Sequence, residues 1–251
     1  MLGMLSSNQF WMDVCKIIVI DLLLSGDNAV VIALACRSLP AEQRRKGVLL
    51  GVGGAIVLRM LLTFFALNLL TLPFLKVVGA LILSWIGVKL ILPEDGHEAA
   101  SVKANAHLWG AVRTIIVADL IMSLDNVLGV AAVANGNSLL LVFGLLVSIP
   151  LIAWSSQLVL KLIDRFPPII YFGGGLLGYV AGEMLVSDGM VAAVLEAMPF
   201  DVHAWIPAIC ALLVMVLGKW LAMRSIATSR VFSLVEGQVS NSTGGLSEKE
   251  R

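Results

Sequence analysis

The apolar residues of this chain are gathered in continuous blocks, each close to the roughly 20 residues that a helix needs to cross a membrane. Of 251 residues, 59% are hydrophobic and only 14% are charged, whereas soluble domains have about 25% charged residues. Inside a bilayer the backbone must satisfy its own hydrogen bonds, which leaves only helices or a closed barrel. Continuous blocks indicate helices. The chain is therefore predicted to be an all-α, polytopic membrane protein.

Seven blocks are predicted to span the membrane, within a single transmembrane domain over residues 1–230. They cover residues 14–36, 47–70, 73–92, 110–134, 138–161, 168–187 and 204–223. The connections at 71–72 and 135–137 are so short that the flanking helices are expected to form tight hairpins. Residues 231–251 are polar, and a disordered cytoplasmic tail is expected there.

Basic residues in the connections predict the orientation, because cytoplasmic loops carry an excess of Lys and Arg. They lie in or at the edges of the first, third and fifth connections and on the C-terminal side of the chain: Arg37, Arg44, Arg45, Lys46, Lys103, Lys161, Arg165, Lys219, Arg224 and Arg230. The alternate connections, 71–72, 135–137 and 188–203, contain none. This alternation predicts a multi-pass protein of the cell (inner) membrane with its N-terminus outside and its C-terminus in the cytoplasm.

An acidic motif occurs twice, at the same internal spacing and 98 positions apart (21 to 119). The copies are Asp21, Ser25, Asp27 and Asn28, and then Asp119, Ser123, Asp125 and Asn126. A fainter similarity joins segments 79–89 and 173–183. The chain is thus predicted to contain two three-helix repeats, about 14–92 and 110–187, and a seventh helix at 204–223. Because three is odd, the second repeat is inverted in the membrane, as in many transporters.

The four aspartates of the motif lie well inside predicted spans, where a short acidic side chain cannot reach water. An ionised Asp near the centre of a membrane helix costs about 2.5–3.5 kcal/mol on insertion scales. This cost favours a binding site over helix caps. On a regular helix Asp21, Ser25 and Asn28 share one face, and Asp27 joins them only if the helix bends near Gly26.

The motif residues offer oxygen atoms and include no His, Cys or Met. Oxygen donors suit hard divalent cations such as Mg²⁺, Ca²⁺ or Mn²⁺, among which the spacing does not choose. The predicted metal ligands, supported by Ser25 and Ser123, are Asp21, Asp27, Asn28, Asp119, Asp125 and Asn126. The ion is expected to be a transported substrate, with no resident cofactor.

Four carboxylates exceed the charge of one divalent cation, so the site requires protonation, a second cation or a basic residue. Arg59, in the second span, is the best internal counter-charge, and the alternative is an Arg that faces lipid or water. Lys89 and Glu183 occupy matching places in the two repeats, near opposite membrane faces. Supporting roles at a gate or an exit path are predicted for them, although snorkelling explains Lys89 equally well.

Three segments, DLLLSGDNAVVIAL (21–34), DLIMSLDNVLGVA (119–131) and AGEML (181–185), resemble the TerC family of integral membrane proteins, in particular its YjbE-like branch. The resemblance covers about residues 10–225 and implies a relative of the LysE-type exporter superfamily. It also implies manganese export, with the acids and asparagines of the two motifs as the metal site.

The predicted function is that of a secondary transporter which exports a divalent cation, manganese first among them, through an acidic site near the membrane midplane. No P-loop is present, so an ion gradient or the membrane potential is the expected driving force. The alternatives are an exporter of an amino acid or another organic cation, an intramembrane aspartyl protease, and a non-transporting scaffold.

The partners expected from the sequence are membrane lipid and the transported metal ion. Its net charge of zero predicts no nucleic-acid partner. No enzymatic activity is expected, and a homo-oligomer is compatible with the sequence.

Overall fold

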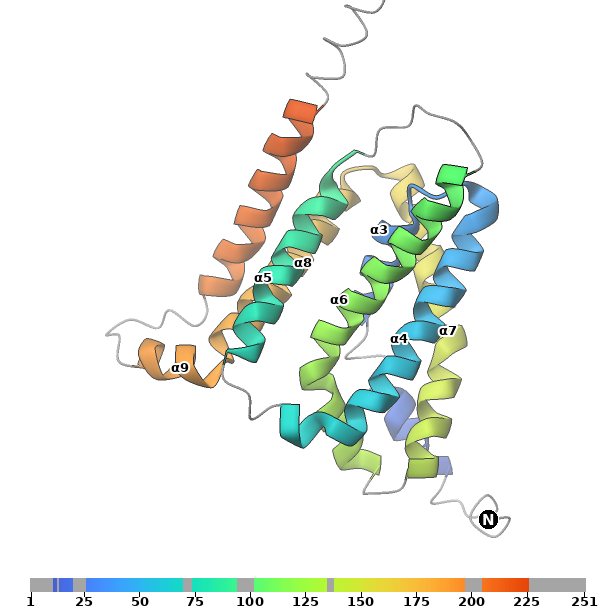
Figure 1. Cartoon of the computed structure of the whole chain (residues 1–251), viewed down its shortest axis with the longest axis vertical. Coiled ribbons are helices and arrows are strands. Elements are labelled where there is room, and N and C mark those ends of the chain that lie inside the picture. The colour runs from blue at the N-terminus through green and yellow to red at the C-terminus, as the bar shows by residue number, and fades with distance from the viewer. Residues whose placement is uncertain are drawn as a thin grey trace, which may run out of the picture.

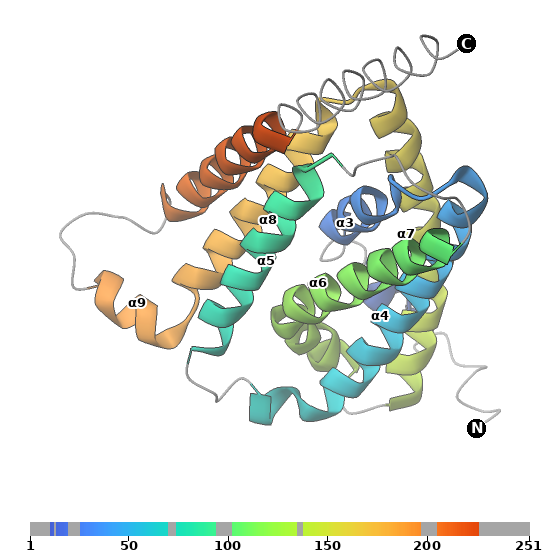
Figure 2. The ribbon, with the colours of Figure 1, turned by 45° about the horizontal axis from the view of Figure 1, so that its top comes forward.

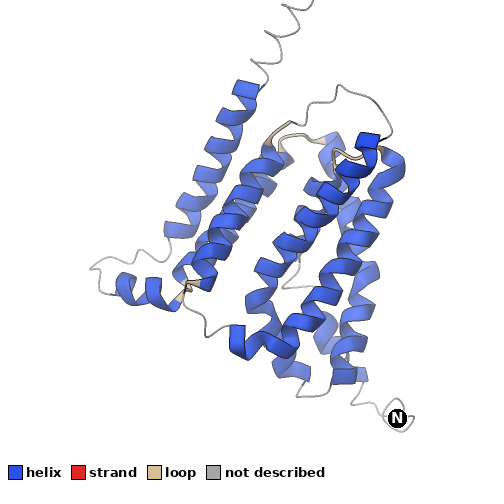
Figure 3. Ribbon diagram, viewed as in Figure 1, coloured by secondary structure: helices blue, strands red, loops and turns tan. Residues whose placement is uncertain are grey.

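The structure is a computed structural model that describes residues 11–12, 14–19, 26–69, 74–93, 102–134, 138–196 and 205–225. Within these ranges, every regular element is a helix (Figure 3). The helices are α3 (Gly26–Cys36), α4 (Ala41–Leu69), α5 (Leu75–Ile91), α6 (Val102–Ala134), α7 (Ser138–Arg165), α8 (Ile169–Val186) and α9 (Gly189–Glu196), followed by Trp205–Ser225.

The described helices overlap the predicted spans, and α3 covers only the second half of the first one. Four of the described helices contain stretches long and apolar enough to cross a membrane, at His107–Leu124, Leu145–Arg165, Ile169–Val186 and Trp205–Ser225. Helix α3 is also apolar but has only 11 residues. The chain is therefore a helical, multi-pass membrane protein.

Helix α9 lies in a connection for which no helix was predicted. Asp188 begins it, because the carboxylate accepts a hydrogen bond from the Met190 N–H at 3.1 Å. Such a bond satisfies one of the N–H groups that a first helical turn leaves without a partner.

The helices form two groups that stand side by side (Figures 1 and 2). One group contains α3, α4, α6 and α7, in which α4 packs mainly against α6, and α3 against α7. The other contains α5, α8 and the helix Trp205–Ser225, in which α5 packs against α8. The groups meet where α5 contacts α6 and where α3 contacts α8.

Glycines allow α4 and α6 to approach closely. A Cβ atom placed on Gly51 would lie 2.5 Å from Ile115 Cδ1, and one on Gly54 would lie 2.6 Å from Ile116 Cδ1. Small residues on one face commonly bring membrane helices together in this way. Because Gly47 in turn faces Leu108, the residue numbers rise together along the contact, and the two helices run parallel.

In the other group the close contacts run antiparallel. A Cβ atom on Gly87 of α5 would lie 3.1 Å from the Gly174 carbonyl oxygen of α8, and one on Gly79 would lie 2.9 Å from Met184 Cε. Elsewhere on α8, a Cβ atom on Gly178 would lie 2.7 Å from the Cys210 carbonyl oxygen. The helix Trp205–Ser225 is thereby held against α8 by backbone contacts.

The hairpin prediction is wrong for α4 and α5, because the described parts of these helices belong to different groups. Their connection is also longer than predicted, since α4 ends at Leu69 and α5 begins at Leu75. Phe74, directly before α5, has a left-handed backbone with φ of 60°, which is uncommon for residues other than glycine. The glycine face of α4 selects α6 as its partner instead of the next helix in the chain.

The loop after α3 joins the ends of several helices at one side of the molecule. Arg37 Nη2 donates a hydrogen bond to the Leu92 carbonyl, just after α5, at 2.7 Å. Arg44 Nη1 forms an ion pair with Asp164 Oδ2, near the end of α7, also at 2.7 Å. Basic residues of the first connection thus lie beside the C-terminal ends of α5 and α7.

Candidate functional site

A buried ion pair joins α4 to α6 midway along both helices. Arg59 Nη2 lies 2.6 Å from Asp119 Oδ1, and the two residues are only 2% and 7% exposed. A charge in such a position is costly unless it is paired and hydrogen-bonded. The parallel glycine contact explains the pairing, since Asp119 follows Ile115 by one turn of α6 on the same face.

Ser123 completes the contact one turn further along α6. Its hydroxyl accepts a hydrogen bond from Arg59 Nε at 3.0 Å and donates one to Asp119 Oδ2 at 3.1 Å. The residue is fully buried. The spacing of four between the acid and the serine of the motif therefore places both on the face that meets the guanidinium.

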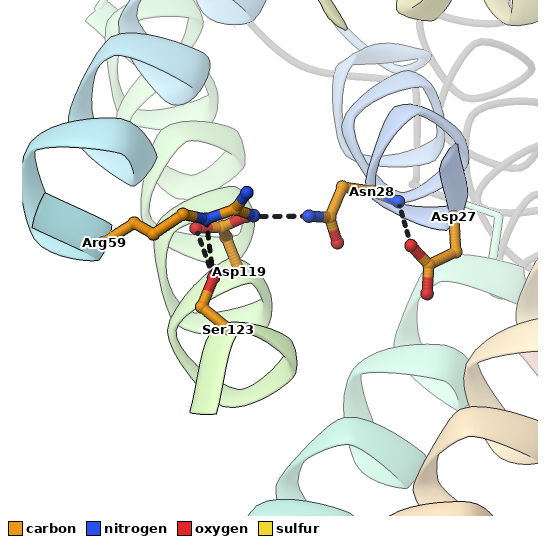
Figure 4. Close-up of polar contacts among 5 residues, drawn as sticks. All are labelled: Asp27, Asn28, Arg59, Asp119 and Ser123. Atoms are coloured by element: carbon orange, nitrogen blue, oxygen red, sulfur yellow. Dashed lines mark hydrogen bonds and ion pairs between the residues drawn. The ribbon is translucent and has the colours of Figure 1, made fainter. Parts of the chain in front are cut away.

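Asn28 links the first copy of the motif to the second (Figure 4). Its Nδ2 donates a hydrogen bond to Asp119 Oδ1 at 2.9 Å, and the residue is 3% exposed. This bond directs the amide nitrogen towards the carboxylate. The other amide atom, Oδ1, is buried and has no hydrogen-bond partner among the described residues. A buried acceptor without a partner costs about 1–3 kcal/mol, so this oxygen is suited to receive a donor or a cation.

Asp27 lies at the start of α3, in its first turn. Its Oδ1 accepts the Asn28 backbone N–H at 2.9 Å, and the residue is half-buried. The first turn of a helix presents N–H groups without intrahelical partners and the positive end of the helix dipole, both of which stabilise a carboxylate. Asp27 thus has a different source of stabilisation from Asp119.

The described residues bring together five of the predicted site residues, namely Asp27, Asn28, Arg59, Asp119 and Ser123 (Figure 4). Asp21 and Ser25 lie outside the described residues. Asp125 and Asn126 belong to α6, but their side chains are outside what the structure describes. Among the side chains it does describe, no group of three His, Cys, Asp or Glu could hold a metal ion.

Lys89 and Glu183 lie away from this cluster, and both are exposed. The contacts of Gly87 with Gly174 and of Gly79 with Met184 show that they stand near opposite ends of the α5–α8 pair. About ten residues of helix, roughly 15 Å, separate their levels. The two residues are therefore not partners of one another.

The glycine face of α4 was missed in the sequence, although it positions Arg59. Gly47, Gly51 and Gly54 recur at intervals of four and three, which places them on one side of a helix. This spacing is the signal of a close helix contact in a membrane.

Apolar helices that enclose a buried ion pair define a multi-pass integral membrane protein with an internal polar site. The model of the family described as "Integral membrane protein TerC family" matches residues 6–226. The chain therefore belongs to the TerC family, as its motifs predicted.

Its relatives carry names that describe membrane proteins. It is 43% identical over 181 residues to "Uncharacterized membrane protein YjbE" of Bacillus subtilis, covering 72% of this chain and 82% of the relative. It is 32% identical over 187 residues to "Uncharacterized membrane protein YceF" of the same organism, covering 70% and 72%. For "UPF0053 inner membrane protein YoaE" of Escherichia coli K12, the identity is 24% over 199 residues, with 72% of this chain and 38% of the relative covered. No solved structure matches the chain.

Proposed function

We propose that the protein is a secondary transporter that exports a divalent cation, manganese first among the candidates, across the cell membrane. The observation that carries this proposal is the buried Asn28 Oδ1, which has no described partner and belongs to a residue bonded to Asp119. An amide oxygen beside a carboxylate is a ligand set that hard divalent cations prefer. Asp27, adjacent in sequence, adds a second carboxylate to this part of the molecule.

The preference for manganese over magnesium or calcium comes from the family resemblance of the motifs. The chemistry of the donors supports all three ions equally. The proposed site also includes Asp21, Asp125 and Asn126, which would complete the coordination from the two copies of the motif.

The packing pattern supports two inverted repeats and seven spans. If α3, α4 and α5 are exchanged for α6, α7 and α8, the contact of α3 with α7 becomes that of α6 with α4. The contact of α3 with α8 likewise becomes that of α6 with α5, and the pairs α3–α6, α4–α7 and α5–α8 map onto themselves. We propose that ion access alternates as one repeat moves against the other. The basic residues that gather near the ends of α3, α5 and α7 support a cytoplasmic location for that side.

The geometry supports this function over its rivals. An amino-acid exporter needs a group for the substrate's carboxylate, but Arg59 is already paired with Asp119. An aspartyl protease needs two carboxylates that share a proton, whereas Asp119 faces a guanidinium. We therefore propose no enzymatic activity.

Manganese accumulation in cells tests the proposal. Cells that carry Asp27→Asn or Asp119→Asn should retain manganese under manganese excess at wild-type protein levels, as cells without the protein do. The matched control is Asp164→Asn, the same chemical change at a 52%-exposed side chain outside the cluster, which should export normally. Wild-type export by both cluster variants would support the scaffold alternative and reject the transport site.

A further inference from the structure

We propose that Arg59 is an internal cation that occupies Asp119 when the transported ion is absent and that restricts the site to divalent cations. The inference rests on the proposed function and concerns the same site. Ion binding at Asp119 and Arg59 binding at Asp119 then become alternative states.

The contacts of Asp119 carry the first step. Its Oδ1 accepts hydrogen bonds from Arg59 Nη2 and Asn28 Nδ2, and its Oδ2 accepts one from Ser123. A carboxylate offers about four acceptor positions, so few remain for an incoming ion. The guanidinium also neutralises the carboxylate, and it would repel a second cation at the same oxygen. Asp119 becomes a full ligand only when Arg59 withdraws.

The elements involved carry the second step. Arg59 and Asn28 come from α4 and α3, in the first repeat, whereas Asp119 and Ser123 come from α6, in the second. The ion pair therefore bridges the two parts that are proposed to move against each other. Replacement of Arg59 by the ion exchanges one bridging positive charge for another and also gives the Asn28 Oδ1 a partner.

Selectivity follows from this exchange. Sodium and potassium carry no more charge than the guanidinium and lack its directed hydrogen bonds to Asp119 and Ser123. A divalent cation carries twice the charge and can displace the guanidinium. Without Arg59, monovalent ions should gain access to the carboxylate.

The test compares the wild type with Arg59→Gln and Arg59→Lys, as full-length protein purified in nanodiscs. Free Mn²⁺ is measured by electron paramagnetic resonance, with and without about 150 mM potassium chloride, an ionic strength near the physiological value. In the absence of potassium, Arg59→Gln should bind Mn²⁺ at least about tenfold more tightly, because no competing cation is left in the site. Potassium should then weaken its binding several-fold more than that of the wild type. Arg59→Lys should remain close to the wild type on both measures.

A second variant keeps every charge. Ser123→Ala removes one acceptor of the guanidinium and should tighten Mn²⁺ binding about threefold, the effect of losing part of one hydrogen bond. If both Arg59→Gln and Ser123→Ala bind Mn²⁺ no more tightly than the wild type, or potassium weakens all the proteins equally, the inference is overturned. If neither the wild type nor Arg59→Gln binds Mn²⁺, the proposed function itself fails.

Discussion

Two acids of the doubled motif, Asp27 in the first copy and Asp119 in the second, occupy different positions of the motif and have different hydrogen-bond partners. Asp27 lies in the first turn of α3, whereas Asp119 lies midway along α6. In the second copy Asp119 is held by a guanidinium and a hydroxyl, and in the first Asp27 is held by a backbone N–H. Between the shared polar residues, the largest difference in side-chain size is at Gly26 in one copy and Leu124 in the other.

The difference extends to the neighbouring helices. The residue 98 positions after Arg59 (59 to 157) is the neutral Gln157 in α7. The position in the second repeat that matches Arg59 therefore carries no charge. Repetition can supply equivalent acids, but the exchange we propose needs a cation beside Asp119 that gives way to the ion.

The largest expected effect comes from leaving the internal cation without its acid. Asp119→Leu removes the carboxylate that pairs with the buried Arg59, which should lower the free energy of unfolding by about 3–5 kcal/mol. Thermal unfolding of the purified protein in detergent would measure it. The double variant Asp119→Leu with Arg59→Met should recover most of the stability but not export. A single variant as stable as the wild type would show that the ion pair is not what stabilises the second copy.

Removal of the Leu124 side chain, which takes the place of Gly26 in the second copy, should have the next largest effect on the free energy of unfolding. Leu124 is buried within the contact of α6 with its neighbours, and Leu124→Ala should cost about 2–5 kcal/mol. The same unfolding measurement applies. If Leu124→Ala lowered the free energy of unfolding less than Leu81→Ala, a change at an exposed leucine, the packing role of Leu124 would be contradicted.

The helix contact that aligns Arg59 with Asp119 gives a third prediction. Gly51→Val places methyl groups against Ile115 and should cost about 1–3 kcal/mol through overpacking. Ile115→Ala in the same chain should restore part of this loss, since it removes the atoms that clash. The control is Gly53→Val, at a position where a Cβ atom meets nothing within 4 Å. Equal losses in Gly51→Val and Gly53→Val would mean that the glycine face does not set the helix separation.

The helices were predictable because continuous apolar blocks leave the backbone few alternatives in a bilayer. The motif residues were predictable because buried acids are costly without a role. Helix partners could not be predicted in the same way. Helix α4 pairs with α6 through Gly51 and Gly54, and the length of the connection between α4 and α5 does not indicate which helix α4 packs against. Helix α9 was missed because its signal is a single capping residue, Asp188, in a short segment.

Asp27→Asn tests the difference between Asp27 and Asp119, and it should destabilise the protein less than Asp119→Leu does. The carboxylate accepts one backbone N–H and lies at a helix start, contributions worth about 0.3–1 kcal/mol. Export should nevertheless be lost, because Asp27 is a proposed ligand of the ion. The measurements are unfolding in detergent and cellular manganese content. Destabilisation as large as that of Asp119→Leu would mean that the two acids have equivalent surroundings.

The smallest effect on stability is expected at Gly26, where the second copy has Leu124. A substitution there tests the backbone conformation without changing the packing of the core. A Cβ atom on Gly26 meets nothing within 4 Å, so Gly26→Leu should change the free energy of unfolding by less than about 1 kcal/mol. Leucine favours helix more than glycine does, by nearly 1 kcal/mol, and it removes the backbone freedom of glycine next to Asp27, so it should reduce manganese export. Gly53→Leu, the same change at another open position, should export normally. Unchanged export in Gly26→Leu would mean that the glycine beside Asp27 is not needed for transport, and that the copies differ in sequence at this position without differing in role.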